Sequence, residues 1–553
     1  MDKPPDLNQL TAEQLRTMVA QLNAQLVSRD QTIAQQAQTL ADKDEVIARR
    51  DTAIQRYQIR EEQMSHEIAL LRRHRYGKRS EGLDKHQLSL LQELIDEDTS
   101  AVETELEKIS VKDRPKADKP APKRQPLPPQ LPRTEIRHDP QSTTCACGCA
   151  MTRIGEDISE KLDYQPGTFS VERHIRGKWA CSSCETLIQK PVAAHIIDKG
   201  IPTTKLLAQV LVSKYADHLP LYRQQQIYAR AGVDLPRSTL ADWVGRCGVE
   251  LTPLVECLRN VIKQQAVLHA DETPVAMLAP GRKRTHTAYV WAYASTRTAD
   301  IQGVVYDFRP SRSGKEARDF LEGWQGKLVC DDYAGYKASF KQGITEIGCM
   351  AHARRKFHDL HVANQSPIAE KALRYIGSLY EIEREAAKLD HPDRQQLRQD
   401  KARSILDKLQ QWLIGQREQV TNGTSTAKAI DYCLKRWEAL TRYVDDGRVP
   451  IDNNWVENQI RPWALGRSNW LFAGSLRSGQ RAANIMSLIQ SAKINGLDPQ
   501  AYLKDVMEQL PTIKYLALDQ LLPHRWEPDN RGDHRALTFI FCFARLFPIF
   551  QTR

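Results

Sequence analysis

Three acidic residues stand in contexts that would suit metal-assisted chemistry on a phosphodiester. Asp271 lies in VLHADETPV, Asp331 in KLVCDDYAGY and Glu457 in IDNNWVENQIRPW. The first two close short apolar or β-branched runs, whereas Glu457 lies in a segment with a helical pattern. Carboxylate oxygens are good ligands for Mg²⁺ or Mn²⁺, and two such ions can activate an attacking oxygen and stabilise the leaving one. We therefore take these residues as the candidate catalytic acids and as ligands of two catalytic metal ions.

The second acid has a neighbour of the same type, Asp332. Successive side chains on a strand point to opposite faces, so only one of Asp331 and Asp332 can easily face the metal ions. The same rule turns Glu272 away from the Asp271 face. Because the chain holds 69 Asp and Glu residues, a set of three acids is weak support for a site unless its surroundings agree.

Basic and aromatic residues accompany the third acid and one further segment. Arginines alternate with Trp463 and Phe472 after Glu457, and AHARRKF forms a second basic cluster. Such side chains near a metal site suit phosphate contacts and stacking on an unpaired base. The alternative for each segment is an amphipathic helix with a solvated face. The predicted DNA contacts are His352, Arg354, Arg355, Lys356, Arg461, Arg467, Trp470, Arg477 and Arg481.

Five cysteines gather at the two ends of an alternating segment, KLDYQPGTFSVERHIRGKWA, which predicts a β-hairpin. Two cysteine knuckles flanking a hairpin are typical of a structural zinc site, in which four thiolates leave no open position. The predicted ligands of one structural Zn²⁺ are Cys145, Cys147, Cys181 and Cys184, with Cys149 as the alternative to one of the first pair. Reduced cysteines in an ordinary hairpin are the other interpretation.

Short strand-like runs between residues 265 and 357 must position the acids. Three runs in succession, a helix over KEARDFLEGW and two further runs match the order of an RNase H-like sheet. In that order Asp271 lies on the first strand, Asp331 ends the adjacent fourth strand, and Glu457 comes from a helix packed beside them. We predict the catalytic domain over residues 263–360 and 441–490, interrupted by an all-helical insertion over residues 361–440.

A seven-residue repeat marks the N-terminal part of the chain. A sustained apolar period of seven predicts a coiled coil, although the second seam of the heptad is polar. We expect self-association into a homo-oligomer; the alternative is a single solvated helix that packs on its own protein. The apolar positions are Val19, Leu26, Ile33, Leu40, Ile47 and Ile54.

The predicted fold class is multidomain α+β, with an RNase H-like α/β catalytic domain. The other parts are a coiled-coil helix with a basic cluster over residues 1–110, a Pro/Lys/Arg linker over 111–140, the zinc-binding β-hairpin module over 141–195, a helical region over 196–262 that is either a DNA-binding helix-turn-helix or plain packing, a helical C-terminal element over 491–530, and an atypical aromatic tail over 531–553.

The composition bounds the function classes. A formal charge of +10 and a pI of about 8.9 permit a nucleic-acid partner without requiring one. The N-terminus lacks the pattern of a signal peptide, and apolar runs stay below spanning length. The cysteines do not match a secreted disulfide framework. We expect a soluble intracellular protein with no membrane partner.

With these motifs in view, the chain resembles the transposases of the insertion-sequence 66 family, the large DDE proteins of bacterial mobile elements. The resemblance rests on RYGKRSE, RIGEDISEKLDY, ERHIRGKWAC, ADHLPLYRQ, HADETPV, DDYAGY, AHARRKF and DNNWVENQIRPWALGRSNWLFAGS, and it extends from about Leu71 to Leu510. It implies a polynucleotidyl transferase that uses two Mg²⁺ or Mn²⁺ ions to cleave double-stranded DNA at the element ends and to join it to a target.

The family motifs also imply roles for individual residues. The first acid falls on Asp271, the second on Asp331 and the third on Glu457, although Asp332 stands where the family usually has glycine. The zinc module of the family usually opens with CxxC, which the tight first knuckle here does not follow. The resemblance further implies small accessory proteins of the same element as partners and a bacterial cytoplasmic, nucleoid-associated location.

Two other functions fit the same features. One is a DNA-binding regulator with an inactive catalytic domain, which would bind DNA without metal-dependent cleavage. The other is a metal-dependent nuclease that cuts DNA but yields no joined product. The abruptly apolar tail after Asn530 leaves open whether this copy is active.

Overall fold

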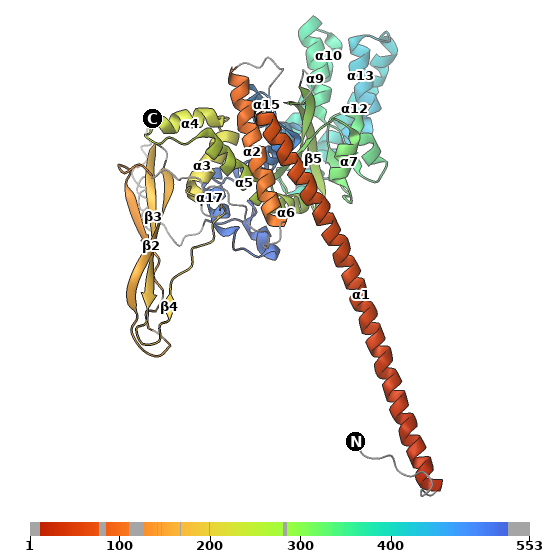
Figure 1. Ribbon diagram of the computed structural model, residues 1–553. Helices are drawn as coiled ribbons and strands as arrows, with labels where there is room; N and C mark the ends of the chain where they lie inside the picture. The colour runs from red at the N-terminus through yellow and green to blue at the C-terminus, as the bar shows by residue number, and fades with distance from the viewer. Residues whose placement is uncertain are drawn as a thin grey trace, which may run out of the picture. The chain divides into compact units, whose positions relative to one another are not determined.

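The computed structural model describes residues 12–76, 85–109, 127–140, 142–144, 146–165, 167–197, 200–279 and 285–528 (Figure 1). The chain divides into two compact units. The first comprises Met1–Leu70 and Glu105–Ala117, and the second comprises Leu71–Thr104 and Asp118–Arg553. The tail over residues 531–553 lies outside the described residues.

The first unit is built on one long helix, α1 (Ala12–Tyr76), of 65 residues. The apolar residues at the repeated heptad position stay between 51% and 62% exposed, so this stripe is uncovered in the single chain. The helix predicted from the heptads is confirmed, and the self-association remains a prediction.

The cysteine-flanked segment forms the predicted hairpin. Strands β2 (Thr152–Gln165) and β3 (Thr168–Ala180) pair antiparallel up to the turn, where Gln165 faces Thr168. Strand β1 (Arg133–Arg137) runs parallel to β3 on its other side, and the short β4 (Leu187–Ile188) pairs with the end of β3. The end of the hairpin thereby brings the two cysteine knuckles together.

A five-stranded sheet carries the first two candidate acids. Its order is β7-β6-β5-β8-β9; β5, β6 and β7 run antiparallel, while β8 and β9 run parallel to β5. The predicted sequence of three strands, a helix and two strands is confirmed. The elements are β5 (Val267–Met277), β6 (His286–Ser295), β7 (Val304–Arg309), α7 (Gly314–Leu321), β8 (Lys327–Val329) and β9 (Thr345–Ile347).

The edge strand β7 is covered by α16 (Leu476–Ile494). The hydroxyls of Ser487 and Ser491, one helical turn apart, accept hydrogen bonds from the backbone N–H groups of Tyr306 (2.8 Å) and Val304 (3.0 Å). An exposed edge strand would leave such groups without protein partners. The helix therefore closes this side of the sheet and joins the C-terminal region to the core.

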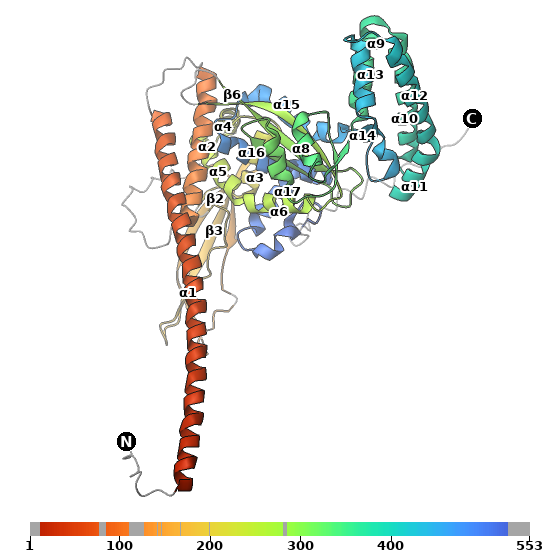
Figure 2. The same cartoon turned by 90° about the vertical axis from the view of Figure 1, so that its right-hand side faces the viewer.

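The predicted insertion is helical and has its own apolar core, which continues onto Val267, Val329 and Ile347 of the sheet. Figure 2 shows α9, α10, α12 and α13 side by side, away from the strands. The elements here are α9 (Met350–Asn364), α10 (Pro367–Ala386), α11 (His391–Leu397), the π-helix η3 (Arg398–Ala402), α12 (Arg403–Gln419), α13 (Ser425–Lys435), α14 (Trp437–Thr441) and the 3₁₀-helix η4 (Arg442–Asp445).

Most of the remaining helices share one apolar core with this sheet. Helix α5 buries Leu240, Trp243, Val244 and Cys247, so the second helix of the candidate helix-turn-helix lies mostly within the core. Among the described residues, every helix is too short or too polar to cross a membrane. The bounds are α2 (Lys85–Ile109), α3 (Thr204–Tyr215), α4 (Leu221–Arg230), α5 (Arg237–Glu250), α6 (Thr252–Ile262), η2 (Ala334–Tyr336), α8 (Lys337–Phe340), α15 (Asn454–Trp470), α17 (Pro499–Gln509) and η5 (Tyr515–Leu521).

Candidate functional site

The first two acids lie at the same level of adjacent parallel strands. His269 of β5 is in register with Val329 of β8, so Asp271 and Asp331, each two residues further on, lie at the same level, where β8 has ended and β5 continues beside β6. Burial, and then the nearby charges of Glu272, Glu457 and Asp331, raise the pKa of Asp271 to about 8. The acids that the sequence singled out therefore share one electrostatic environment.

Asp331 and Asp332 have separate surroundings. An Asp331 carboxylate oxygen accepts the backbone N–H of Tyr333 at 2.9 Å, and its charge acts on Asp271. The Asp332 carboxylate instead forms ion pairs with Arg436 and, at 3.4 Å, with Lys337. The geometry thus favours Asp331 over Asp332 as the second member of the acidic cluster.

Glu457 reaches this cluster because the start of α15 is tied to β5. The side chain of Asn453 bridges two residues of the strand: its Oδ1 lies 2.8 Å from His269 Nδ1, and its Nδ2 donates to the carbonyl of Ala270 at 2.9 Å. His269 and Asn453 are fully buried. Burial lowers the pKa of His269 to about 4, so the ring is neutral near pH 7. Glu457 follows one turn later on α15.

The basic residues of α9 contact different neighbours. His352 Nδ1 lies 3.8 Å from Glu457 Oε1, and Arg355 lies 3.7 Å from the other carboxylate oxygen. Lys356 is placed over the ring of Tyr432, 4.5 Å from its centroid. Arg354 and Arg355 line a groove between α9 and α10, together with His358, Arg384 and Asn454 at the start of α15. Glu381 of α10 also lines this groove, so the basic side chains there share it with one acidic residue.

Glu272 has a role that its sequence context did not indicate. Its carboxylate pairs with Arg312 at 2.6 Å and accepts the hydroxyl of Tyr336 at 3.0 Å. Arg312 also lies over the ring of Tyr333, 4.1 Å from its centroid. Glu272 therefore has a cation of its own beside Asp271. Sequence spacing gave no signal for this pair, because Arg312 lies in the loop before α7.

The arginine-rich flank of Glu457 separates into exposed and internal residues. Arg461 is exposed and lines a hollow with His218 and Lys493. Arg467 donates to the carbonyl of Pro274 on β5 at 3.1 Å, while Trp470 packs edge-on against Trp463. Arg477 is half-buried. Arg461 and Arg467 are thus the exposed arginines of this flank, and Arg481 is the buried one.

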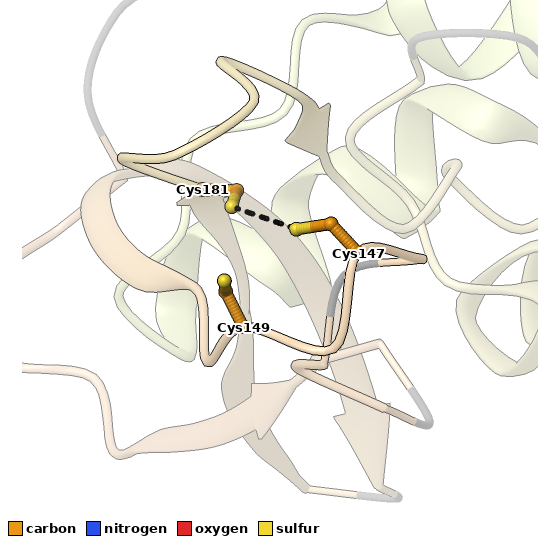
Figure 3. A group of neighbouring side chains, drawn as sticks. All are labelled: Cys147, Cys149 and Cys181. Carbon is orange, nitrogen blue, oxygen red and sulfur yellow. Dashed lines mark hydrogen bonds between the residues drawn. The ribbon is translucent and has the colours of Figure 1, made fainter.

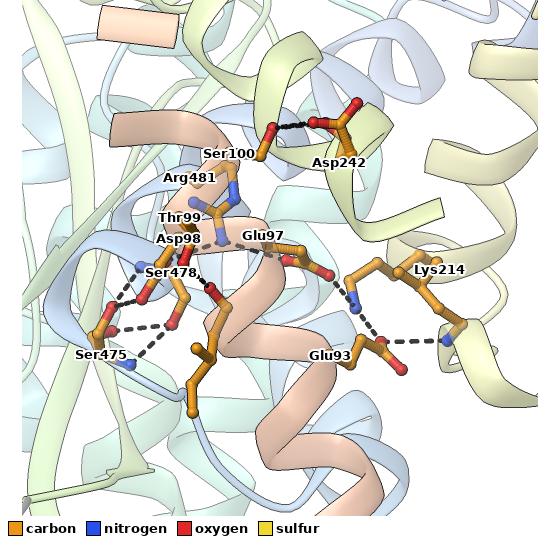
Figure 4. A network of polar contacts seen from close by, with 12 residues as sticks. Glu93, Glu97, Asp98, Thr99, Ser100, Lys214, Asp242, Ser475, Ser478 and Arg481 are labelled. Atoms are coloured by element: carbon orange, nitrogen blue, oxygen red, sulfur yellow. Dashed lines mark hydrogen bonds and ion pairs between the residues drawn. The ribbon is translucent and has the colours of Figure 1, made fainter. Parts of the chain in front are cut away.

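Arg481, also predicted as a DNA contact, is only 5% exposed and lies inside an ion-pair network (Figure 4). It donates to Glu97 at 3.1 Å and to Asp98 at 3.0 Å. Lys214 pairs with Glu93 at 2.6 Å and with Glu97 at 2.9 Å. These acids lie on α2, so Arg481 holds that helix against α16 and is not exposed for a contact with DNA.

Four cysteine sulfurs converge at the base of the hairpin. The ligand atoms of Cys147, Cys149 and Cys181 lie within 4.8 Å of one another (Figure 3). Cys184 Sγ lies 3.9 Å from Cys147 Sγ. Hydrogen bonds from Ser183 and Cys147 lower the pKa of Cys149. Cys145 lies outside the described residues, so the first knuckle is represented here by Cys147 and Cys149.

Profiles of known protein families match four parts of the chain. The profile of the "Transposase IS66 family" matches residues 199–481, and that of the "zinc-finger binding domain of transposase IS66" matches residues 142–185. The "Transposase C of IS166 homeodomain" profile matches residues 63–136, and the "IS66 C-terminal element" profile matches residues 487–524.

Related proteins occur in Sinorhizobium fredii (strain NBRC 101917 / NGR234), where each is described as uncharacterized. Protein y4jD is 39% identical over 423 residues, which cover 73% of this chain and 82% of y4jD. Protein y4qI is 36% identical over 490 residues, covering 84% of this chain and 89% of y4qI. Protein y4hP is 33% identical over 491 residues, covering 83% and 88%.

Proposed function

The chain belongs to the IS66 family of transposases, and we propose that it catalyses metal-dependent DNA strand cleavage and strand transfer at the ends of an insertion sequence. The observation that carries this proposal is the approach of Asp271 on β5, Asp331 just after β8 and Glu457 on α15, where burial and then the nearby carboxylate charges raise the pKa of Asp271. The sheet order β7-β6-β5-β8-β9 supports an RNase H-like catalytic domain.

The donor set of the three acids fits two Mg²⁺ or Mn²⁺ ions. Their ligand atoms are carboxylate oxygens, which hard divalent cations prefer, and the mutual repulsion of the acids would be relieved by bound cations. When bound, the metal ions activate the attacking oxygen and stabilise the leaving oxygen in both the cleavage and the joining step. Asp271 and Asp331 would provide metal ligands from the sheet, and Glu457 would provide the third ligand from α15.

The surrounding residues position the acids and the DNA. The bridge from Asn453 to His269 and Ala270 holds the start of α15 against β5, which fixes Glu457 relative to Asp271. Arg312 pairs with Glu272, although the charge of Glu272 still contributes to the raised pKa of Asp271. Arg354, Arg355 and Arg461 would contact the phosphate backbone near the acids. Positioning and charge, rather than covalent chemistry by the protein, carry phosphoryl transfer.

The hairpin module fits one structural Zn²⁺. Four thiolates suit a closed tetrahedral site, and the sulfurs of Cys147, Cys149, Cys181 and Cys184 lie together at the base of β2 and β3. We assign Cys149 in place of Cys145 because its sulfur is within the cluster. The exposed heptad stripe of α1 would be covered by another copy of the chain, which makes the transposase a homo-oligomer acting on nucleoid DNA.

The proposal is tested with the purified full-length chain, Mg²⁺ and labelled duplexes that carry the native element ends. A transposase yields both nicked ends and joined products, and Asp271→Asn yields neither. Nicked ends without joined products would instead indicate a nuclease. Salt-dependent binding without cleavage would indicate a DNA-binding regulator.

A further inference from the structure

A second group of side chains of metal-ligating types shares Glu457 with the acidic cluster. The ligand atoms of Cys349, His352 and Glu457 lie within 4.8 Å of one another, and Cys349 is fully buried. We propose that these residues form a binding site for one divalent cation of the zinc class, separate from the cysteine site of the hairpin. The site stands on its ligand geometry and does not depend on the proposed strand transfer.

The starts of two helices bring the ligands together. Cys349 is the N-cap residue of α9, and His352 follows three residues later on the same face of the helix. Glu457 lies in the first turn of α15. The backbone N–H of Met350 bonds to the carbonyl of Ile451 at 3.0 Å, which joins the two helix starts. The site is therefore built on rigid elements rather than on loops.

Two polar atoms in the group have no hydrogen-bond partner within the described part of the chain. These are His352 Nδ1 and Glu457 Oε1, both buried. Their separation of 3.8 Å is too long for a hydrogen bond. Ligands at about 2.0–2.1 Å from a shared tetrahedral ion would be about 3.4 Å apart, so a small inward movement would suit an ion between them. A bound cation would satisfy both atoms at once.

The Cys349 thiol is protonated when no metal is bound, because burial raises its pKa to about 12. It accepts the backbone N–H of Asn453 at 3.2 Å and lies at the starts of α9 and α15, where helix dipoles favour negative charge. A sulfur, an imidazole nitrogen and a carboxylate oxygen select Zn²⁺ or a similar ion over Mg²⁺. Three protein ligands also leave one coordination position open.

Glu457 belongs to this site and to the proposed catalytic acids. If strand transfer requires Glu457 on a catalytic ion, Zn²⁺ held by Cys349 and His352 competes for that carboxylate. We therefore expect added Zn²⁺ to inhibit the Mg²⁺-dependent reaction of the wild type, and to inhibit the Cys349→Ser variant less. This consequence rests on the proposed function, whereas the binding itself does not.

The test uses Co²⁺ as the probe, with the full-length chain and no DNA. Bound metal is measured by elemental analysis, and thiolate coordination by the sulfur-to-cobalt charge-transfer band. Cys349→Ser removes the thiolate and keeps a residue favoured at an N-cap, and His352→Gln provides an independent variant. Cys433→Ser is the matched control, because Cys433 is another buried free cysteine, on α13.

We expect Cys349→Ser and His352→Gln each to bind one Co²⁺ fewer per chain than the wild type or Cys433→Ser, or to bind it at least about tenfold more weakly. A Cys181→Ser/Cys184→Ser double variant should keep a weaker sulfur-to-cobalt band, which comes from the Cys349 thiolate alone. Adding Cys349→Ser to this double variant should remove the band. Equal metal content and equal spectra in wild type, Cys349→Ser and His352→Gln would overturn the proposal. Asp271→Asn, which abolishes the proposed strand transfer, should keep this Co²⁺ site.

Discussion

His269 and Asn453 lie 184 residues apart in the sequence, yet their side chains meet at 2.8 Å inside the core. Asn453 also donates to the carbonyl of Ala270, the residue just before Asp271. The same asparagine begins the helix that carries Glu457. One buried side chain therefore sets the relative position of the first and third candidate acids.

We expect Asn453→Ala to reduce strand cleavage by at least about tenfold, because α15 loses its anchor on β5. It should also lower the free energy of unfolding by about 2–4 kcal/mol, since His269 and the Ala270 carbonyl are left buried without partners. Asn364→Ala is the control, as Asn364 is exposed at the end of α9. Cleavage rates and urea midpoints of the two variants check this. Equal cleavage by both would contradict a positioning role for Asn453.

Arg481 should affect stability, whereas Arg461 should affect DNA binding. Arg481→Ala leaves Asp98 buried without its cation, whereas Glu97 keeps Lys214, and the loss costs about 3–5 kcal/mol. Arg461→Ala should leave the urea midpoint unchanged and reduce the salt dependence of DNA binding by about one phosphate contact. A stable Arg481→Ala variant that binds DNA poorly would show that Arg481 reaches DNA after all.

The contact of Asp446 with Lys327 and Arg448 predicts a pH dependence of stability. Burial opposes the charge of Asp446, but hydrogen bonds from Arg448 and Lys327 prevail and hold its pKa well below the ordinary value of 3.8. The folded state then binds fewer protons than the unfolded state just below pH 3.8. The stabilisation is therefore complete above that pH and is lost as the pH falls further.

Asp446→Asn tests this dependence. The variant should be less stable than the wild type by roughly 1–3 kcal/mol at neutral pH, and the difference should shrink in acid. Urea unfolding at a series of pH values measures it. A difference that stays constant down to the lowest accessible pH would show that Asp446 does not contribute through its charge.

The sulfur cluster predicts which cysteines hold the structural zinc. Cys149→Ser and Cys181→Ser should release this ion and expose the hairpin to limited proteolysis, whereas Cys145→Ser should keep it. Zinc content and the rate of hairpin cleavage by a protease report the outcome. Loss of zinc in Cys145→Ser but not in Cys149→Ser would restore the ligand set that the sequence suggested.

The candidate catalytic residues could be predicted from the sequence, but most of the residues that hold them in place could not. The strand runs and motifs predicted the order of the sheet and singled out Asp271, Asp331 and Glu457, because hydrophobic patterns and local motifs are short-range signals. The buried partners could not be predicted in this way. Arg481 pairs with Asp98, 383 residues away in the sequence, and Asp332 pairs with Arg436, 104 residues away. Such long-range ion pairs form only in the folded chain, so the sequence gives no sign of them.

A cellular transposition assay tests the three proposed catalytic acids together. The assay uses a marked element with its native ends and the small proteins that the element encodes. Asp271→Asn, Asp331→Asn and Glu457→Gln should abolish movement, while Asp332→Asn should retain it because Asn still offers an acceptor to Arg436. Movement by any of the first three variants, or loss in Asp332→Asn with retention in Asp331→Asn, would contradict the assigned acids.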